Sequence, residues 1–458
     1  MNIDFKALCT SYHTSAIENL RAWIKIPSVL DLASVRPDAP FGEEVYRALR
    51  FIGEMAEEDG FEVDYCDGYV TEISFGTGKR TIGIFAHADV VPATGNWNYP
   101  PFEAVLADEK IYGRGTSDDK GPAMAAYYAL KVLKDNDLIN NYRVVLVIGG
   151  NEENGSRCLD YYFNQLKKPH VDFGFTPDGN FPLIYGEKGI VNFALIGEFK
   201  WDRIKKIEAG QAVNLVIDEA KAIVDGDSNL EKALSQTGYR YQLTPINQEE
   251  CELIFYGTSA HGSVPELGDN AGTKLIGFLG EFYRIYPLQK TGRLLSDLSG
   301  KELDIFTTSS ALGATTLNVG LINYDGEKFF LAVNFRFPET LDCEKAMRKV
   351  QDRVHPLDIK YDRHSPVLLF SKDSSFVQTL LEVYQKETGD YQHQPLTIGG
   401  GTYAKSAQNT LAFGSAFPGR NDLIHAPNEH IHLSDFLLSM SIYAHAIAAL
   451  GRKDALKI

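Results

Sequence analysis

The 458-residue sequence predicts an α/β fold in which a mixed sheet covered by helices is interrupted by an inserted α+β domain. Two observations indicate this fold. Short apolar strand-like runs alternate with helical runs in the first part of the chain, which is typical of βαβ units in one sheet. Near residue 192 the pattern changes to charged helical segments between strand-like runs, and 458 residues exceed what one hydrophobic core usually serves.

The first elements follow from local patterns. Residues 2–26 have the pattern of an amphipathic helix with interspersed charges, and they lack the uninterrupted apolar core of a secretory signal. Gly121 and Pro122 open a further helix, since proline is tolerated in the first helical turn. The segments that alternate between strand and helix patterns are 81–86, 122–134, 143–148 and 171–176.

The rest of the chain predicts a separate domain and then a return to the first sheet. In the middle, helical stretches are expected at 201–208 and 227–236, and strands at 252–256 and 329–335. Strong helix patterns follow at 374–387 and 434–450. The simplest arrangement is one domain formed by residues 1–191 and 368–458, with residues 192–367 inserted into it.

The composition excludes several classes of protein. A formal net charge of -16 disfavours nucleic acid and anionic membrane surfaces as partners. We expect no stretch that is long and uncharged enough to span a bilayer. The five cysteines are odd in number and form no Cys-x-x-Cys pair, which is typical of a reduced intracellular protein. We therefore expect a cytoplasmic location.

The first candidate site residues end a predicted strand, in Phe85-Ala86-His87-Ala88-Asp89. Alternation along an extended chain turns the side chains of His87 and Asp89 to the same side. In a metal site, an imidazole binds the ion and a carboxylate holds the other ring nitrogen. The alternative is a surface histidine beside a turn-forming aspartate, which the His-x-Asp spacing alone does not exclude.

Two neighbouring acids, Asp118 and Asp119, lie between a glycine-containing turn and the start of a helix. One aspartate is enough to cap a helix, because its charge suits the helix dipole. The second acid is then available to bridge two cations. Ordinary capping and metal binding are both compatible with this pair.

Three more acids follow predicted strands. Glu152 and Glu153 come after the apolar run 144–148, and adjacent acids at the end of a buried strand suggest a nearby cation. One carboxylate can bind metal while its neighbour accepts a proton from water. A solvated loop is the alternative for this pair, and Asp178 is equally compatible with a plain turn.

A histidine-containing loop precedes the last predicted helix. His425 is the candidate ligand in this loop, and His430 and His432 are close competitors. The candidate ligands are aspartate, glutamate and histidine without cysteine, a set that suits zinc, manganese or cobalt.

Taken in order, these segments resemble the M20 metallopeptidase family and, within it, bacterial dipeptidases of the PepV-like and carnosinase-like group. The resemblance extends over nearly the whole chain. It implies a zinc-peptidase-like catalytic domain formed by residues 1–191 and 368–458, and an inserted lid domain formed by residues 192–367. The size of this insertion resembles the enlarged lid of the PepV-like group and implies a monomer.

The resemblance also implies two divalent metal ions, with zinc first and manganese or cobalt as alternatives. By motif match, His87 and Asp178 would hold one ion. Glu153 and His425 would hold the other, and Asp118 would bridge the two.

Further acids beside these ligands have implied roles. Asp89 would orient His87. Glu152 would act as general base toward water and later as acid toward the leaving amine. Asp119 would be a neighbour of the bridging ligand, although an exchange of roles between Asp118 and Asp119 stays open.

The inserted domain would supply groups that hold the substrate. His261 matches the family's donor to the charge that develops on the carbonyl oxygen, with a surface loop histidine as the alternative. Arg336 would clamp the terminal carboxylate bidentately, with Asn214 as a weaker contact. The lid would have to close over the catalytic domain for His261 to act. Backbone donors around that carboxylate, in a stretch that also suits a tight turn, would come from Gly400, Gly401 and Thr402.

The resemblance thus implies a dipeptidase of Xaa-His or broad specificity. One position departs from the PepV-like pattern, since Asn180 stands where an acid usually follows the Asp178 position, and this bears on recognition of a free substrate amine. The alternatives are an M20 deacylase of N-acyl or N-succinyl amino acids and a non-catalytic peptide-binding protein, although Glu152 argues against the latter. No Gly-x-Ser-x-Gly elbow or complete phosphate-binding glycine motif occurs, which disfavours serine hydrolases and nucleotide enzymes.

Overall fold

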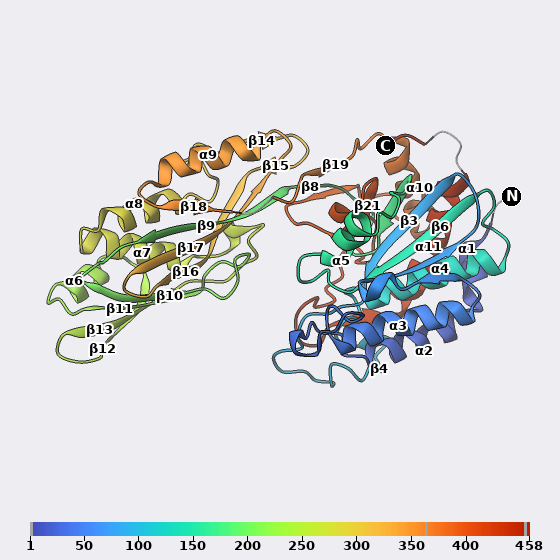
Figure 1. Cartoon of the computed structure of the whole chain (residues 1–458), viewed down its shortest axis with the longest axis horizontal. Coiled ribbons are helices and arrows are strands. Elements are labelled where there is room, and N and C mark those ends of the chain that lie inside the picture. Colours follow the sequence, from blue (N-terminus) through green and yellow to red (C-terminus); the bar gives the residue numbers. More distant parts are fainter. Residues whose placement is uncertain (1–2, 362–363, 453–455) are drawn as a thin grey trace. The chain divides into compact units, whose positions relative to one another are not determined.

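The computed structural model of the chain contains two compact units (Figure 1). It describes residues 3–361, 364–452 and 456–458. Unit 1 is formed by Met1–Tyr185, Phe370–Leu396 and Thr402–Ile458, and unit 2 by Gly186–Leu369 and Thr397–Gly401. A mixed sheet with helices and a separate antiparallel sheet confirm the predicted fold class.

The compact units differ from the predicted domains at residues 186–191, 368–369 and 397–401, all of which belong to unit 2. The sequence assigned residues 397–401 to the first domain, whereas they pack with unit 2. Two hydrogen bonds hold this segment there. The Arg336 guanidinium donates to Gly399 O (2.8 Å), and the Lys188 amide donates to Ile398 O (3.2 Å).

Unit 1 is built around the parallel centre of a nine-stranded sheet with the order β1-β2-β6-β3-β7-β21-β8-β19, in which β20 also pairs with β8. Strands β6, β3, β7 and β21 run parallel, as the predicted βαβ connections require. Strand β8 carries the chain from unit 1 into unit 2. The strands are β1 Glu62–Asp64, β2 Val70–Phe75, β3 Arg80–His87, β6 Tyr142–Gly149, β7 Phe173–Thr176, β8 Ile184–Glu187, β19 Leu368–Leu369, β20 Leu396–Ile398 and β21 Thr410–Ala412.

Helices pack against this sheet through apolar faces. Helix α4 contains the predicted helical segment 122–134. It contacts α11, β3 and β6, and its buried side chains include Met124, Leu130 and Leu133. Helix α3 packs on β1 and β2. The helices of unit 1 are α1 Phe5–Thr10, α2 His13–Ile24, α3 Glu43–Glu58, α4 Lys120–Asp135, α5 Arg157–Asp160, α10 Ser375–Thr388 and α11 Leu433–Arg452, with short turns η1 Leu32–Ser34, η2 Cys66–Gly68, η3 Tyr161–Gln165 and η5 Tyr403–Ser406.

A small sheet of three strands, in the order β22-β5-β4, lies beside the loops that follow the main sheet of unit 1. Both of its pairings are antiparallel. Its strands are β4 Val105–Ala107, β5 Lys110–Tyr112 and β22 His430–His432. It joins two segments that are far apart in sequence.

Helix α11 corrects the expectation that no stretch could span a membrane. Its 20 residues are long and apolar enough to do so by length and composition alone. However, 67% of its 18-residue apolar window is buried inside the protein, where α11 packs against α4, α10 and β3. Packing in the core of unit 1 therefore accounts for its composition.

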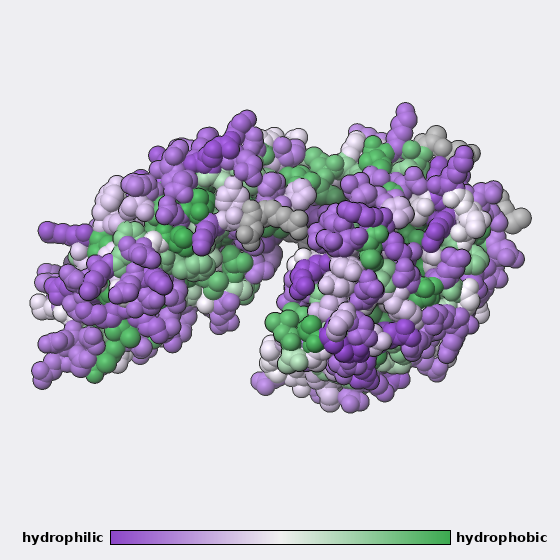
Figure 2. All heavy atoms as spheres, viewed as in Figure 1, coloured by the Kyte–Doolittle hydropathy of each residue, from purple (hydrophilic) through white to green (hydrophobic). Residues whose placement is uncertain are grey.

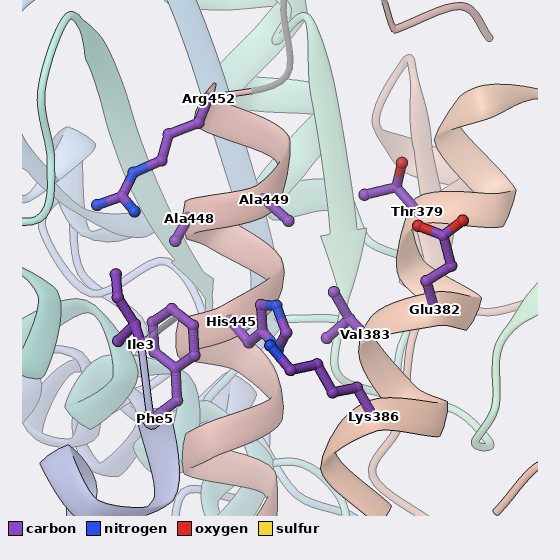
Figure 3. A pocket seen from close by; sticks show the side chains of 10 residues that line it. All are labelled: Ile3, Phe5, Thr379, Glu382, Val383, Lys386, His445, Ala448, Ala449 and Arg452. Atoms are coloured by element: carbon purple, nitrogen blue, oxygen red, sulfur yellow. The ribbon is translucent and has the colours of Figure 1, made fainter. Parts of the chain in front are cut away.

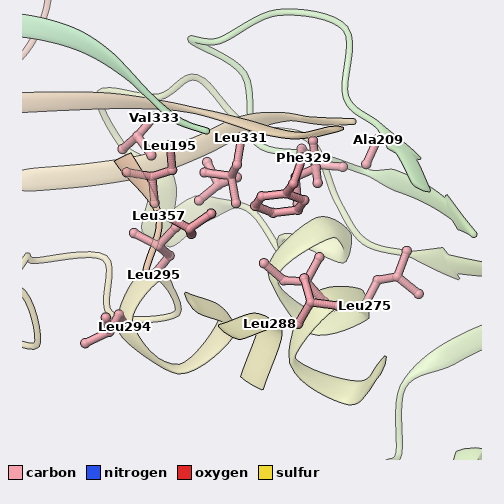
Figure 4. Packing of buried hydrophobic residues seen from close by; sticks show 14 of the residues in the cluster. Leu195, Ala209, Leu275, Leu288, Leu294, Leu295, Phe329, Leu331, Val333 and Leu357 are labelled. Carbon is pink, nitrogen blue, oxygen red and sulfur yellow. The ribbon is translucent and has the colours of Figure 1, made fainter. Parts of the chain in front are cut away.

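Unit 2 is an eight-stranded antiparallel sheet with the order β12-β13-β11-β10-β16-β17-β9-β18. Helices α7, α8 and α9 share one core with it, in which Leu275 and Leu288 of the helices face Leu331 of β17 (Figure 4). The elements are β9 Gly189–Glu198, β10 Ile204–Ala209, β11 Glu219–Asp225, β12 Arg240–Pro245, β13 Glu250–Tyr256, β14 Thr308–Ser309, β15 Gly313–Ala314, β16 Thr316–Tyr324, β17 Lys328–Phe337, β18 Asp358–Lys360, α6 Leu230–Ser235, η4 Pro265–Leu267, α7 Ala271–Phe282, α8 Tyr286–Leu295 and α9 Cys343–Val354.

Two predicted helices are wrong in detail. The segment 201–208 contains most of strand β10, which pairs with β11 and β16. Ile204 and Ile207 are buried in the core of unit 2, and a register shift interrupts simple alternation. The segment 2–26 forms two helices, α1 and α2, instead of one. Asn2 itself lies outside the described residues.

The outer surface suits the acidic composition. Figure 2 shows hydrophilic side chains over most of the visible face of each unit. The five cysteines are all free thiols, four of them buried, which agrees with the absence of a disulfide framework in the sequence.

The core of unit 2 gives a test of this packing. We expect Leu331→Ala to lower the free energy of unfolding of unit 2 by about 2 to 5 kcal/mol, because Leu331 is fully buried and the substitution leaves a cavity. Hydrogen exchange of peptides from β16 and β17 measures this change. The matched control is the neighbouring Phe330→Ala, whose side chain is 39% exposed, and an equal effect of both substitutions would contradict the assigned core.

Candidate active site

Four of the predicted site residues of unit 1 lie at the carboxyl ends of its parallel strands. His87 is the last residue of β3, Glu152 and Glu153 follow β6, and Asp178 follows β7. In α/β sheets the loops at this edge form the ligand-binding crevice. Because β6, β3 and β7 are adjacent, their loops converge on one place.

Asp118 is the centre of this group. One of its carboxylate oxygens, Oδ1, lies 3.0 Å from His87 Nε2, and the other, Oδ2, lies 2.8 Å from His425 Nε2. His87 Nε2 and Asp118 Oδ1 are both buried, yet neither has a hydrogen-bond partner among the described residues. Two lone-pair donors that face one another without a hydrogen bond are arranged like two ligands of one cation.

The remaining predicted ligands divide between the two sides of Asp118. Asp178 Oδ2 lies 3.9 Å from His87 Nε2, and Glu153 Oε1 lies 3.0 Å from His425 Nε2. The five residues are therefore together, with the two histidines on opposite oxygens of one carboxylate. Which of them bind metal stays a prediction.

The carboxylates around Asp118 are close together and buried, an environment that favours nearby positive charge. Burial acts to raise the pKa of Asp118, but the nearby His425 and His87 hold it well below its ordinary value. Burial raises the pKa of Glu153, and the charge of Asp118 adds to that rise. Contacts with Asp118 and Glu153 raise the pKa of His425 to about 11. Divalent ions would stabilise these crowded carboxylates directly.

The donor set fits such ions. Oxygen and imidazole nitrogen donors of His87, Asp118 and Glu153 lie within 4.8 Å of one another, a spacing that suits metal ligands. No thiol takes part, and the mixture of carboxylate and imidazole suits zinc, manganese or cobalt. The residues present thus accommodate divalent metal.

Asp119 contributes differently from Asp118. Its Oδ2 accepts a hydrogen bond from the backbone amide of His87 (3.1 Å), and its buried Oδ1 has no partner among the described residues. Burial raises the pKa of Asp119 well above its ordinary value. Asp119 therefore supports the end of β3, and the bridging position between the histidines is occupied by Asp118.

Asp89 has a structural task beyond the predicted one. Its carboxylate accepts hydrogen bonds from the amides of Glu152 (2.9 Å) and Glu153 (3.1 Å). His87 Nδ1 lies 3.0 Å from the Asp89 carbonyl and 3.5 Å from its carboxylate. A carbonyl can only accept, so Nδ1 carries a proton and Nε2 presents its lone pair. Asp89 thus fixes both the ring of His87 and the turn that carries the two glutamates.

Glu152 lies among charges that increase its basicity. Burial raises the pKa of Glu152 well above its ordinary value, His87 opposes this rise, and Asp178 adds to it. A carboxyl group with a raised pKa is suited to accept and return protons near neutral pH.

Two glycines allow the chain to close tightly around the site. A Cβ at Gly149 would lie 1.8 Å from the hydroxyl of Tyr403, which also lies 3.0 Å from Cys158 Sγ. A Cβ at Gly121 would lie 2.0 Å from the carbonyl oxygen of Thr116. Neither approach leaves room for a side chain.

Glu429 is a supporting residue that the sequence analysis missed. It is fully buried, and its Oε1 accepts hydrogen bonds from the amides of Gly115, Ser117 and Asp118 (3.0, 3.0 and 3.3 Å). Its Oε2 accepts from the Arg114 guanidinium at 2.6 Å. Because Glu429 is in the same loop as His425, it ties this loop to the one that carries Asp118. Only its sequence position near His425 could have drawn attention to it.

The other two C-terminal histidines lie elsewhere. His430 Nε2 is 3.1 Å from Lys110 Nζ and 3.8 Å from Asp422 Oδ1, and His432 is grouped with the same aspartate. Among the three competitors, the geometry favours His425 as the residue that faces Asp118.

In unit 2, His261 is held by its own loop. Its Nδ1 lies 2.6 Å from Ser263 Oγ and accepts the Ser263 amide at 3.3 Å, which assigns the ring proton to Nε2. The Gly262 amide donates to Asn214 O (2.7 Å), so Asn214 supports this loop through its backbone. The tautomer at His261 is the one that a hydrogen-bond donor requires.

Unit 2 also contains two buried cations, Arg336 and Lys188. Arg336 is 3% exposed, and its guanidinium donates to Asn334 Oδ1 and Gly399 O (both 2.8 Å). No carboxylate of the described residues lies within ion-pair distance of it, and burial lowers the pKa of Arg336 to about 10. Burial and the charge of Arg336 also lower the pKa of Lys188, which the sequence analysis did not select. This pair is suited to an anion.

The other predicted substrate contacts are divided between the two units. Gly400 and Gly401 are in unit 2, and a Cβ at Gly400 would lie 4.0 Å from Arg336 Nη1. Thr402 is in unit 1, where its side chain caps η5 by accepting from the Ala404 amide. Asn180 is exposed and pairs with Ala416 through an isolated backbone bridge.

A cavity of about 380 Å³ lies away from this chemistry, between the N-terminal segment, α10 and α11 (Figure 3). Its lining includes Phe5, His445 and Lys386. None of the residues that line it belongs to the carboxylate and histidine group. The cavity therefore does not bear on the site around Asp118.

Comparison with known proteins identifies a peptidase family. Residues 83–449 match the family described as peptidase family M20/M25/M40. The chain is 35% identical over 453 residues to "Putative dipeptidase YtjP" of Bacillus subtilis (strain 168), which covers 95% of this chain and 97% of that protein. It is 34% identical to a protein named "Putative dipeptidase" from Staphylococcus epidermidis, over 98% of this chain and all of that protein.

Solved structures share the fold at low sequence identity. A structure of the di-peptidase Dug1p from Saccharomyces cerevisiae has a TM-score of 0.62 at 15% identity and covers 98% of both chains. Human carnosine dipeptidase 1 has a TM-score of 0.60 at 15% identity, again over 98% of both chains. At this identity the likeness concerns the fold alone.

The Glu429 network predicts a measurable coupling. We expect Glu429→Gln to destabilise unit 1 by about 3 to 5 kcal/mol, because it leaves the buried Arg114 without its anion. We also expect weaker metal binding, since three amides of the Asp118 loop lose a charged acceptor. Metal titration and hydrogen exchange of the 113–119 peptide are the measurements.

The control is an exposed ion pair of the same unit. Glu54→Gln removes the i,i+4 partner of Arg50, and we expect a change below about 1 kcal/mol and unaltered metal binding. Similar effects of the two substitutions would show that Glu429 does not support the site.

Proposed function

This chain belongs to peptidase family M20/M25/M40, and from that premise we propose that it is a dipeptidase that uses two divalent metal ions. It is a metal-binding hydrolase of peptide bonds by its family. The names of its full-length relatives support a dipeptide substrate. Zinc is the first choice of metal, with manganese or cobalt as alternatives.

One observation carries the two-metal proposal. The two oxygens of Asp118 face different histidines, at 3.0 Å from His87 Nε2 and 2.8 Å from His425 Nε2. Asp178 Oδ2 lies 3.9 Å from His87 Nε2, and Glu153 Oε1 lies 3.0 Å from His425 Nε2, so each histidine has one further carboxylate beside it. A single carboxylate with an imidazole at each oxygen is the arrangement expected of a bridging ligand between two cations.

The chemistry that the metals supply when bound is polarisation of the scissile carbonyl and a lowered pKa of water. The carboxylate of Glu152 accepts a proton from the attacking water and then donates it to the leaving amine. Asp89 holds the Glu152 amide at 2.9 Å and so fixes the position of this base. His261, with its proton on Nε2, donates to the charge that develops on the carbonyl oxygen.

Arg336 binds the terminal carboxylate of the peptide in this proposal. Two of the five N–H donors of a guanidinium are used by Asn334 and Gly399, which leaves donors for a ligand. Lys188 adds a second positive charge beside them. A site that contains two cations and no carboxylate partner for Arg336 among the described residues prefers an anionic substrate end.

We extend the proposal to a monomer located in the cytoplasm. The acidic composition, with a net charge of -16, and five free thiols support that location. The large insertion, which resembles an enlarged lid, supports the monomer.

The direct test is hydrolysis of a substrate panel by protein that has been stripped with chelator and then refilled with zinc, manganese or cobalt. The panel contains Xaa-His and β-alanyl dipeptides, other dipeptides, and matched N-acyl amino acids. We expect loss of cleavage on stripping, recovery on refilling, and cleavage of dipeptides. Cleavage of the N-acyl compounds alone would identify a deacylase, and binding without cleavage would identify a peptide-binding protein.

The proton acceptor has its own test. Glu152→Gln should lower kcat by about 10²- to 10⁴-fold, because the amide cannot take a proton. Metal content should remain that of the wild type, since Glu152 is not among the proposed ligands. Unchanged turnover would remove Glu152 from the mechanism, and lost metal would make it a ligand.

The carboxylate clamp predicts a change in KM. Arg336→Lys should raise KM for free dipeptides by roughly 10- to 100-fold, since lysine cannot bind a carboxylate bidentately. Dipeptide amides, which lack that carboxylate, should be affected much less. An equal rise for both substrates would show that Arg336 acts on the fold of unit 2 instead of on the substrate.

A further inference from the structure

A second group of metal-type side chains lies in unit 1 outside the proposed active site. It consists of Asp422, His430 and His432, and one ligand atom of each lies within 4.8 Å of the others. His430 and His432 are the ends of strand β22, so alternation along the strand places both on one face. Residue His432 is paired with Lys110 of β5 on that face.

The aspartate reaches this face by a defined contact. The His430 amide donates to the Asp422 carbonyl at 3.1 Å, which holds the start of the loop against β22. Asp422 Oδ1 then lies 3.8 Å from His430 Nε2. Ligands of one tetrahedral ion lie roughly 3.3 to 3.6 Å apart for bonds of about 2.0 to 2.2 Å, so only a small contraction is needed.

The tautomer of His430 suits a ligand. Its Nδ1 lies 2.9 Å from the carbonyl oxygen of Asn428, which can only accept, so the proton is on Nδ1. The lone pair of Nε2 therefore points toward Asp422 and Lys110. This is the arrangement in which a backbone carbonyl orients a metal-binding imidazole.

Asp422 provides an independent observation. Its side chain is 9% exposed, and its buried Oδ1 has no hydrogen-bond partner among the residues that the structure describes. Burial raises the pKa of Asp422, and His430 opposes that rise. A buried carboxylate oxygen without a donor is costly, and a cation between it and the two imidazoles removes the cost.

Beside the Asp422 carboxylate, the ammonium of Lys110 is in direct contact with one of these imidazoles. This ammonium lies 3.1 Å from His430 Nε2 and so competes for the same lone pair. Arg420, the other nearby cation, makes a two-point ion pair with Asp435 (2.6 and 3.0 Å). Lys110 is therefore the residue that an incoming ion must displace.

We propose that Asp422, His430 and His432 bind a divalent transition-metal ion of the zinc class, separate from the pair proposed around Asp118. A set of two imidazoles and one carboxylate favours zinc or cobalt over magnesium or calcium. The ion would close the loop between residues 422 and 430, which contains His425 and Glu429. Its task would be to hold this loop in place.

The test counts ions in the full-length protein. Chelator-stripped protein is dialysed against Co²⁺, and bound cobalt and its visible absorption are measured. We expect His432→Asn and Asp422→Asn each to bind one ion fewer than the wild type and to lose one component of the spectrum. The control His393→Asn removes an exposed histidine of the same unit that pairs with Asp390, and it should change nothing.

A variant that is expected to strengthen metal binding keeps the test decisive if a protein with a substituted ligand does not fold. Lys110→Met removes the competing ammonium and should tighten the weakest cobalt site by about tenfold or more. The proposal is overturned if the ligand variants retain the wild-type number of ions, or if Lys110→Met leaves every cobalt affinity unchanged. Because the readout is the difference between variants, it does not depend on how many ions the Asp118 group binds.

Discussion

The mutual repulsion of buried carboxylates is the constraint on which the rest of unit 1 depends. Asp118, Glu152, Glu153 and Asp178 converge where parallel strands end, and burial raises the pKa of both glutamates. Negative charges gathered at such a place are stable together only with compensating positive charge. His425 supplies part of it, and divalent ions would supply the rest.

A set of buried hydrogen bonds holds this unfavourable arrangement in place. Asp89 joins the end of β3 to the turn after β6, and Glu429 joins the C-terminal loop to the loop before α4. In both cases a carboxylate accepts hydrogen bonds from backbone amides, so these contacts are charge-assisted and directional. The proposed ion at Asp422 would fix the same C-terminal loop from its other end.

The two units carry opposite chemical character. The group in unit 1 is rich in acids, whereas unit 2 contains Arg336 and Lys188, both buried and mutually repulsive. A metal-binding group suits the scissile carbonyl, and a cationic group suits a terminal carboxylate. Both kinds of group suit a peptide substrate, and the names of the full-length relatives support the dipeptide that we propose.

Local patterns and motif order in the sequence determined the α/β fold class, most strands and helices around the site, and the membership of the family. They failed at 201–208, where pairing with β11 and β16 outweighed an apparent helix pattern. Only the tertiary structure decided which histidine faces Asp118, and it alone revealed Glu429, Lys188 and the Asp422 group. Isolated polar residues have no periodicity or motif, and contacts between segments some 300 residues apart leave no local signal, so their partners become known only when the chain is folded.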